Sequence, residues 1–391
     1  MSEMSLKERT LSDLRRRRQN ILDGKINSIP SPFPRFSEDF VGLEQSEYIA
    51  VTSFTKGGKT QFVLYMLFEA LMYLFKNRDK ARMKVFYFVL EETPDRILQR
   101  FMCYLLYKLE GIRYSPRDLR STKNDQPISE EILSKFEQTP YKEYIEFFES
   151  TFVFSTTSNP TGIYYECKKY AEENGVTHKT QVSFSEDEVF DYYTPNDPFE
   201  LRIVVIDHIS LIDSERGMTK KEAIDKLSEY LAKFLRNRYG FTPIVIQQQS
   251  TENESSDNFK LGRIRPSGAG LSDSKYVQRD VNILMGLFSP AKFGLREYLG
   301  YDITKFQDRI RFLEMCNNRD GEAGGIIALY FDGATCTFEE LPQATDRIGL
   351  QRWYDKIEGE HARISMFMVR KKLRKRFNDR ITYGKKRSAK L

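Results

Sequence analysis

The feature that most constrains the fold is a segment rich in glycine and lysine, residues 53–60, between two apolar runs. Residues 48–54 predict a buried strand, and residues 61–75 predict a helix. Gly57 and Gly58 allow the backbone to turn so that successive N–H groups face a phosphate, and the N-terminus of the helix adds partial positive charge. This strand, turn and helix therefore predict a nucleotide site.

The side chains of the segment have distinct expected roles. Lys59 can reach the β- and γ-phosphates of ATP, and the hydroxyl of Thr60 can ligate Mg²⁺. Ser53 stands where the phosphate-loop pattern GxxxxGK[ST] has its first glycine. An ordinary glycine-rich turn is the alternative, but the flanking strand and helix favour ATP and Mg²⁺. The other expected nucleotide-binding residues are Lys56, Gly57 and Gly58.

A second motif is the apolar run 203–206, which ends in Asp207. A carboxylate at the C-terminal end of a buried strand can hold the shell of a Mg²⁺ ion through water. An aspartate that only caps a loop is the alternative. Beside a phosphate-binding loop, we expect Asp207 and Thr60 to form the metal site.

Hydrolysis also needs a group that orients or deprotonates water, and Glu91 ends the apolar run 84–90. Glu92 is the competing candidate, because strand alternation lets only one of the two face the site. We favour Glu91. We expect its strand to lie beside the strand that leads into the phosphate-binding loop.

Gln249 ends a further apolar strand, where its amide could respond to loss of the γ-phosphate; Gln247 and Gln248 compete for this role. The polar loop that follows, residues 250–275, is long enough to suggest a function. We expect this loop to bind single-stranded DNA. Its candidate DNA-binding residues are Lys260, Arg263 and Arg265.

Alternating apolar strands and helices predict an α/β fold with a mostly parallel sheet flanked by helices. Strands after about residue 280 lack long intervening helices, which predicts an antiparallel C-terminal extension. Residues 5–23 predict an amphipathic helix, followed by a proline-rich linker. We expect this helix to pack on a neighbouring copy. The predicted domains are 1–24 (linker helix), 25–342 (ATPase) and 343–391 (helical, basic tail).

The charge distribution suggests a polyanionic partner. Residues 363–391 hold twelve Lys and Arg against Asp379 alone, so the rest of the chain is acidic although the net charge is +5. The longest apolar run, residues 62–75, is shorter than the roughly 20 residues of a membrane span. The N-terminus lacks a secretory signal, and the four scattered cysteines suggest neither zinc nor a disulfide framework. We expect a cytoplasmic protein. Residues 178–200 predict an acidic, aromatic surface hairpin.

Several segments, taken in order, resemble the ATPase domain of DnaB-family replicative helicases, which are RecA-like P-loop NTPases of superfamily 4. They are residues 26–60 with the phosphate-binding loop, the strand end at 89–93, the Asp207 strand, PIVIQQQS, LSDSKYVQRDVNILM and NNRDGEAGG before FEEL. The match covers roughly residues 25–342. The family often lacks the first glycine of the phosphate-binding pattern, as this chain does.

The resemblance implies a ring, usually a hexamer, that binds ATP between subunits and moves 5′ to 3′ on single-stranded DNA. By itself Arg319 could be a surface cation; the resemblance implies a trans-acting arginine finger. The family often has Lys where this chain has Asn317, which leaves that γ-phosphate contact weaker or supplied differently. The helix at 5–23 is similar in position to the family's linker helix. The family's N-terminal helical domain is absent here, a primase or helicase loader is a candidate partner, and the compact form looks like a phage protein.

Other functions remain open from the residues alone. A filament-forming recombinase or another DNA-stimulated RecA-like ATPase would need much the same motifs. A viral DNA-packaging motor usually carries a nuclease domain with clustered acids, whereas the residues after 342 are basic. A structural DNA-binding protein with a degenerate ATPase would not need Lys59, Thr60, Glu91, Asp207 and Arg319 together.

Overall fold

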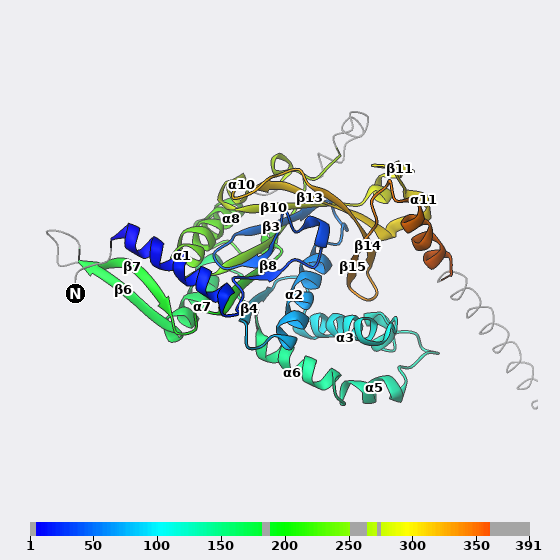
Figure 1. Ribbon diagram of the computed structural model, residues 1–391, viewed down its shortest axis with the longest axis horizontal. Helices are drawn as coiled ribbons and strands as arrows, with labels where there is room; N and C mark the ends of the chain where they lie inside the picture. The colour runs from blue at the N-terminus through cyan, green and yellow to red at the C-terminus, as the bar shows by residue number, and fades with distance from the viewer. Residues whose placement is uncertain (1–4, 182–187, 251–263, 272–274, 360–391) are drawn as a thin grey trace, which may run out of the picture. The chain divides into compact units, whose positions relative to one another are not determined.

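The computed structural model describes residues 5–181, 188–250, 264–271 and 275–359 (Figure 1). The chain divides into two compact units. One unit comprises Met1–Ser289 and Arg311–Glu340, and the other comprises Pro290–Ile310 and Leu341–Leu391. The basic residues 363–391, Lys260 and Arg263 lie outside the described residues.

The first unit is built on one nine-stranded sheet with the order β15-β14-β13-β10-β3-β9-β8-β4-β5. Its strands are β3 (Ile49–Ser53), β4 (Arg82–Val89), β5 (Phe152–Ser155), β8 (Glu200–Asp207), β9 (Thr242–Gln248), β10 (Ile283–Phe288), β13 (Ile310–Asn318), β14 (Ile326–Asp332) and β15 (Thr337–Glu340). The strands from β10 to β5 pair in parallel, whereas β13 is antiparallel to β10 and β15 is antiparallel to β14. The predicted parallel sheet with an antiparallel C-terminal extension is therefore confirmed.

One prediction about strand order is wrong. The strand that precedes Glu91, β4, pairs with β8 and β5, so β8 and β9 separate it from β3. The chain leaves β3 through the helix α2 (Lys59–Lys76) and re-enters the sheet three places away. Strands buried on both faces are apolar throughout, so their sequences carry little information about which neighbours they pair with.

Helices cover both faces of the sheet and bury its two apolar surfaces. One core joins β-strand residues such as Val51 and Val205 to α2, α3 and α6, and the opposite core joins residues such as Ala50 and Val204 to α7 and α8. Successive strand residues thus enter different cores, as a pleated strand requires. The helices of this unit are α1 (Leu6–Leu22), α2, α3 (Pro94–Glu110), α4 (Pro116–Leu119), α5 (Glu130–Phe136), α6 (Tyr141–Thr151), α7 (Pro160–Glu173), α8 (Lys220–Glu229, continued by a π-helical turn, Tyr230–Arg236) and α10 (Lys275–Asp280).

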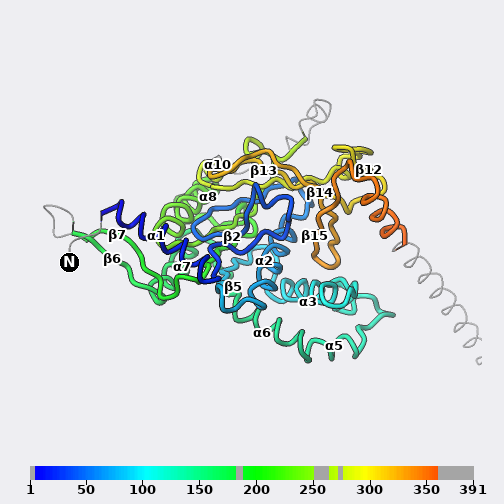
Figure 2. Tube along the Cα trace, viewed as in Figure 1, coloured from blue at the N-terminus to red at the C-terminus, as the bar shows by residue number. Residues whose placement is uncertain are grey.

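Two small antiparallel sheets flank the main one. The short strands β1 (Ser28–Pro30) and β2 (Gly42–Glu44) pair within the proline-rich linker. The strands β6 (Gly175–Gln181) and β7 (Glu188–Pro195) form the hairpin predicted within residues 178–200. Helix α1 lies along this hairpin (Figure 2), and Arg9 forms a 2.9 Å ion pair with Asp191 of β7. The linker helix therefore also contacts its own chain.

The second unit contains β11 (Glu297–Tyr298), β12 (Tyr301–Asp302), α11 (Ile303–Phe306) and a helix over residues 347–359. The hydroxyl of Tyr301 donates a 2.7 Å hydrogen bond to the carbonyl of Pro342, which joins the two segments of the unit. Across the part of the chain that the structure describes, no helix combines the length and apolar character that a membrane span needs.

Candidate nucleotide-binding site

The predicted site residues gather at the carboxyl edge of the parallel strands. The phosphate-binding loop follows β3, Asp207 ends β8, and Glu91 follows β4 by two residues. Parallel strands that end together open a crevice at this edge, which is where ligands bind in open α/β sheets. Arg319 follows the antiparallel β13 and so lies at the other edge.

The loop backbone can be built only with glycine at its turn. A Cβ on Gly57 would lie 2.3 Å from Oγ of Ser53, and Gly58 has φ +99°, in the left-handed region. Gly58 then caps the N-terminus of α2, so free N–H groups at the start of this helix face the loop. Ser53 therefore acts through packing, and the cradle fits a phosphate group.

The cation of the site is held against the loop itself. The Nζ of Lys59 donates to the carbonyl oxygens of Ser53 and Phe54, at 3.3 and 3.5 Å. These long contacts can be exchanged for phosphate oxygens without breaking the fold. Lys56, by contrast, is exposed at the loop apex with φ +60°.

Thr60 and Asp207 are brought together, as a shared Mg²⁺ site requires. Oγ1 of Thr60 donates to Oδ1 of Asp207 at 3.0 Å, and the hydroxyl of Tyr87 donates to Oδ2 at 2.8 Å. Asp207 is only 3% exposed, and this burial raises its pKa to about 6, against the lowering effect of the two hydrogen bonds. A buried carboxylate with a raised pKa gains from a divalent cation, so these oxygens fit Mg²⁺.

The two glutamates after β4 differ in their surroundings. Glu92 is held by Arg100 in a bidentate ion pair, whose Nε–Oε2 distance is 2.9 Å. Glu91 is exposed and has no hydrogen bond or ion pair with the described residues, yet its charge helps raise the pKa of Asp207. The placement favours Glu91 over Glu92 as the residue free to meet a water molecule.

The three glutamines at the end of β9 point in alternate directions. Gln248 donates to the hydroxyl of Thr55 in the phosphate-binding loop. Gln249 donates from Nε2 to Oγ1 of Thr52 and to the carbonyl of Ser267, both at 2.9 Å. Gln249 therefore joins the strand that carries the loop to the returning end of the 250–275 segment. Gln247 is fully buried, and neither of its amide atoms has a partner among the described residues.

Arg319 lies at the amino edge of the sheet, away from the phosphate-binding loop of its own chain. Its backbone N–H donates to the carbonyl of Asn282 at 3.0 Å, and Asn282 in turn donates to Tyr48, just before β3. From Ile49 to Ser53 the strand spans about 13 Å at roughly 3.3 Å per residue. Its exposed guanidinium donates to the carbonyl of Arg279. Arg319 therefore cannot complete the site in the same chain.

Of the three predicted DNA-binding residues, Arg265 is the one that the structure describes. It is exposed, and its positive charge opposes the burial that raises the pKa of Glu314. Its DNA-binding role stays a prediction.

Three supporting residues were missed by sequence reasoning. They are Tyr87, Gln248 and Arg311. Arg311 is 1% exposed and donates from Nε to the carbonyl of Gly57 at 2.9 Å, and its guanidinium stacks over Phe331. A charged residue inside the apolar run 310–315 is the signal that could have found it, because buried charges need partners.

Solved structures with this arrangement include a replicative helicase and a separate ATPase domain. The structure of a DnaB-like replicative helicase, described with its interactions with primase, superposes with a TM-score of 0.57 at 16% identity, over 86% of this chain and 67% of that one. The ATPase domain, from another helicase, superposes with a TM-score of 0.61 at 15% identity, over 87% of this chain and 100% of that one. This chain has the fold of a DnaB-like helicase ATPase domain. No protein-family model matches the sequence, nor does any curated protein.

Within the DnaB-like fold, the described site holds a phosphate cradle, a lysine, a carboxylate–threonine pair and a free glutamate. These residues fit ATP with Mg²⁺. Among the described residues, the set lacks a cation on the far side of the γ-phosphate, and Arg319 at the opposite edge of the sheet is a candidate to supply it from a second copy.

Proposed function

We propose that this chain is an ATP-dependent DNA helicase that works as a ring and hydrolyses ATP between adjacent copies. The observation that carries the proposal is the separation of Arg319 from the phosphate-binding loop, because each edge of the sheet then provides half of one site. The DnaB-like fold supports this reading. The number of subunits, six, comes from the resemblance.

The residues of one copy would bind the nucleotide and prepare the water. Lys59 and the loop N–H groups hold the phosphates, and Thr60 and Asp207 would hold Mg²⁺, which neutralises charge on the phosphate oxygens. Glu91 accepts a proton from the attacking water. Arg319 of the partner subunit stabilises the charge that develops on the transferred phosphoryl group.

The glutamine bridge offers a route from the nucleotide to DNA. Gln249 bonds both Thr52, on the strand that leads into the phosphate-binding loop, and Ser267, at the return of the 250–275 segment. A shift of the phosphate-binding loop would therefore be felt by the segment that carries Lys260, Arg263 and Arg265. Cations of this kind contact phosphates without reading bases, so binding to single-stranded DNA should weaken steeply with salt.

The N-terminal helix supports an assembly of several copies. Leu6, Leu14 and Ile21 of α1 are 75%, 57% and 58% exposed, so the helix leaves apolar side chains uncovered in the single chain. Such side chains gain free energy when a second copy covers them. We propose that α1 docks on the adjacent subunit. A primase or a helicase loader is a further candidate partner.

The deciding experiment is strand displacement on a forked duplex with ATP and Mg²⁺, comparing a 5′ tail with a 3′ tail. We expect unwinding that needs the 5′ tail, with ATPase activity stimulated by single-stranded DNA. Lys59→Ala should abolish both activities, and Lys76→Ala, at the far end of the same helix, should leave both intact.

Electron microscopy on DNA separates the proposal from its nearest rival. Closed rings support the helicase, whereas open filaments with DNA-stimulated ATPase and no unwinding would indicate a recombinase. A protein with no ATP turnover at all would contradict both and favour a structural DNA-binding role.

A further inference from the structure

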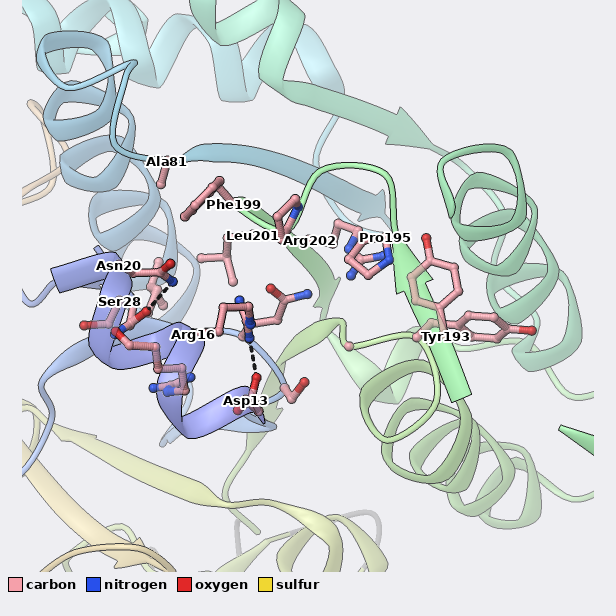
Figure 3. A pocket seen from close by; sticks show the side chains of 18 of the residues that line it. Asp13, Arg16, Asn20, Ser28, Ala81, Tyr193, Pro195, Phe199, Leu201 and Arg202 are labelled. Atoms are coloured by element: carbon pink, nitrogen blue, oxygen red, sulfur yellow. Dashed lines mark hydrogen bonds and ion pairs between the residues drawn. The ribbon is translucent and has the colours of Figure 1, made fainter. Parts of the chain in front are cut away.

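A second cavity lies at the amino edge of the sheet, on the side away from the phosphate-binding loop (Figure 3). It has a volume of about 650 Å³, within the range of roughly 300–1,000 Å³ typical of small-molecule sites. Residues that precede or begin the parallel strands form its floor, among them Ser46, Ala81, Leu201 and Gly240. Helix α1 and strand β7 form other parts of its wall.

The lining of this cavity is strongly cationic. Among the described residues that line it, five are arginines and one is a carboxylate, Asp13, which already pairs with Arg16. The arginines are Arg16, Arg17, Arg202, Arg236 and Arg238. Arg17 pairs with Glu44, but an excess of positive charge remains, so the cavity favours an anion with several charges.

Arg202 is the centre of the argument. It is the third residue of β8, is 2% exposed, and lies between the rings of Tyr193 and Phe241, whose centroids are 5.1 and 5.4 Å from its guanidinium carbon. Its Nε and Nη1 have no hydrogen-bond partner among the described residues. A buried guanidinium without an anionic partner is costly, which points to a ligand that supplies one.

The nearby acids are engaged elsewhere. Glu200 accepts a 2.9 Å hydrogen bond from the hydroxyl of Tyr170. Asp197 pairs with Arg82 and accepts a 3.0 Å hydrogen bond from the backbone of Phe199. Neither forms an ion pair with Arg202 in the described part of the chain, so the chain itself does not neutralise this arginine.

We propose that this cavity binds a small phosphorylated anion through Arg202 and its neighbouring arginines. A guanidinium presents its N–H groups as a planar fork that matches two phosphate oxygens. Several arginines around one cavity suit a diphosphate or triphosphate group, either free or carried by a nucleoside. The aromatic rings of Tyr193, Phe199 and Tyr239, which also line the cavity, can stack on a base in the second case.

The test is calorimetric titration of pyrophosphate into the assembled full-length protein that carries Lys59→Ala. This background removes phosphate binding at every phosphate-binding loop, so the heat cannot come from the ATP site of the same or an adjacent copy. We expect one site per chain, with affinity that falls as ionic strength rises. Absence of binding would overturn the proposal and leave the helicase function untouched.

Variants locate the site. Adding Arg202→Met should weaken pyrophosphate binding at least tenfold, and Arg216→Met, which removes an exposed arginine outside the cavity, should not change it. Arg238→Met, an exposed lining residue whose loss does not threaten the core, should weaken binding severalfold. Unchanged affinity in both Arg202→Met and Arg238→Met, with circular dichroism showing folded protein, would contradict the assignment.

Ligand comparison identifies the chemistry. ADP that binds like pyrophosphate indicates that the phosphate group alone is recognised, and tighter binding of ADP indicates a nucleotide site. Both results support the proposal if Arg202→Met weakens them. Adenosine that binds as well as ADP would overturn it, because recognition would then not need the phosphates.

Discussion

The two edges of the central sheet differ in how complete their chemistry is. At the carboxyl edge, one chain brings a cradle, a lysine, a threonine and a carboxylate into direct contact, with Thr60 and Asp207 3.0 Å apart. At the amino edge, Arg319 is exposed, and its N–H groups donate to backbone carbonyls. The difference shows that a single chain can grip a nucleotide, but that efficient turnover requires the amino edge of another copy.

The largest expected effect is on turnover when the amino edge is altered. Arg319→Ala should lower the rate of ATP hydrolysis about 10³-fold or more, because it removes the charge that stabilises the transferred phosphoryl group. Nucleotide affinity, measured by binding of a fluorescent ATP analogue, should stay within about twofold. Arg216→Ala is the matched control.

Mixing then asks whether the two edges serve one site. Arg319→Ala protein combined with Glu91→Ala protein should recover part of the activity, since some seams pair an intact finger with an intact glutamate. A mixture as inactive as its components would break the comparison, because both defects would then lie within one chain.

At the carboxyl edge, Glu91→Gln should reduce turnover about 10²–10⁴-fold, as expected for loss of a general base. Glu92→Gln should act mainly on stability, because Glu92 is tied to Arg100. Steady-state ATPase assays and thermal melting of both variants measure the split. A larger loss of turnover in Glu92→Gln would reverse the assignment.

The acid dependence of the carboxyl edge should be smaller. Burial raises the pKa of Asp207 to about 6, so the carboxylate is mostly ionised at pH 7 and mostly protonated at pH 5. Because kcat/KM follows ionisations of the free enzyme, it should fall about tenfold over this interval. Tyr87→Phe removes a hydrogen bond that lowers this pKa, so the acid limb should move to higher pH. An unmoved limb would exclude Asp207 as its cause.

The smallest effect concerns the support of the cradle. Arg311→Met should weaken ATP binding severalfold and lower the free energy of unfolding by about 1–3 kcal/mol, because the carbonyl of Gly57 loses a buried charged donor. Isothermal titration and urea unfolding measure the two changes. Arg309→Met, on the residue just before β13, is the control.

Local sequence was sufficient for the elements and for the cis half of the site. The apolar runs around residues 48–54 and 203–206 predicted β3 and β8, and the glycines predicted a turn that a Cβ on Gly57 would prevent. Strand order could not be read, because β4 is apolar on both faces and carries no mark of its neighbours. Helices α4–α6, the bond from Arg311 to Gly57 and the cavity around Arg202 depend on contacts between distant segments.

The placement of Arg319 opposite the phosphate-binding loop also gives any assembly a direction. A pair related by a two-fold axis would present identical surfaces to each other, so it could not match a finger with a cradle. Copies must instead follow one another head to tail, and the series ends only by closing on itself. Such a circle has two unlike faces, and a machine that advances one way along a strand needs that asymmetry.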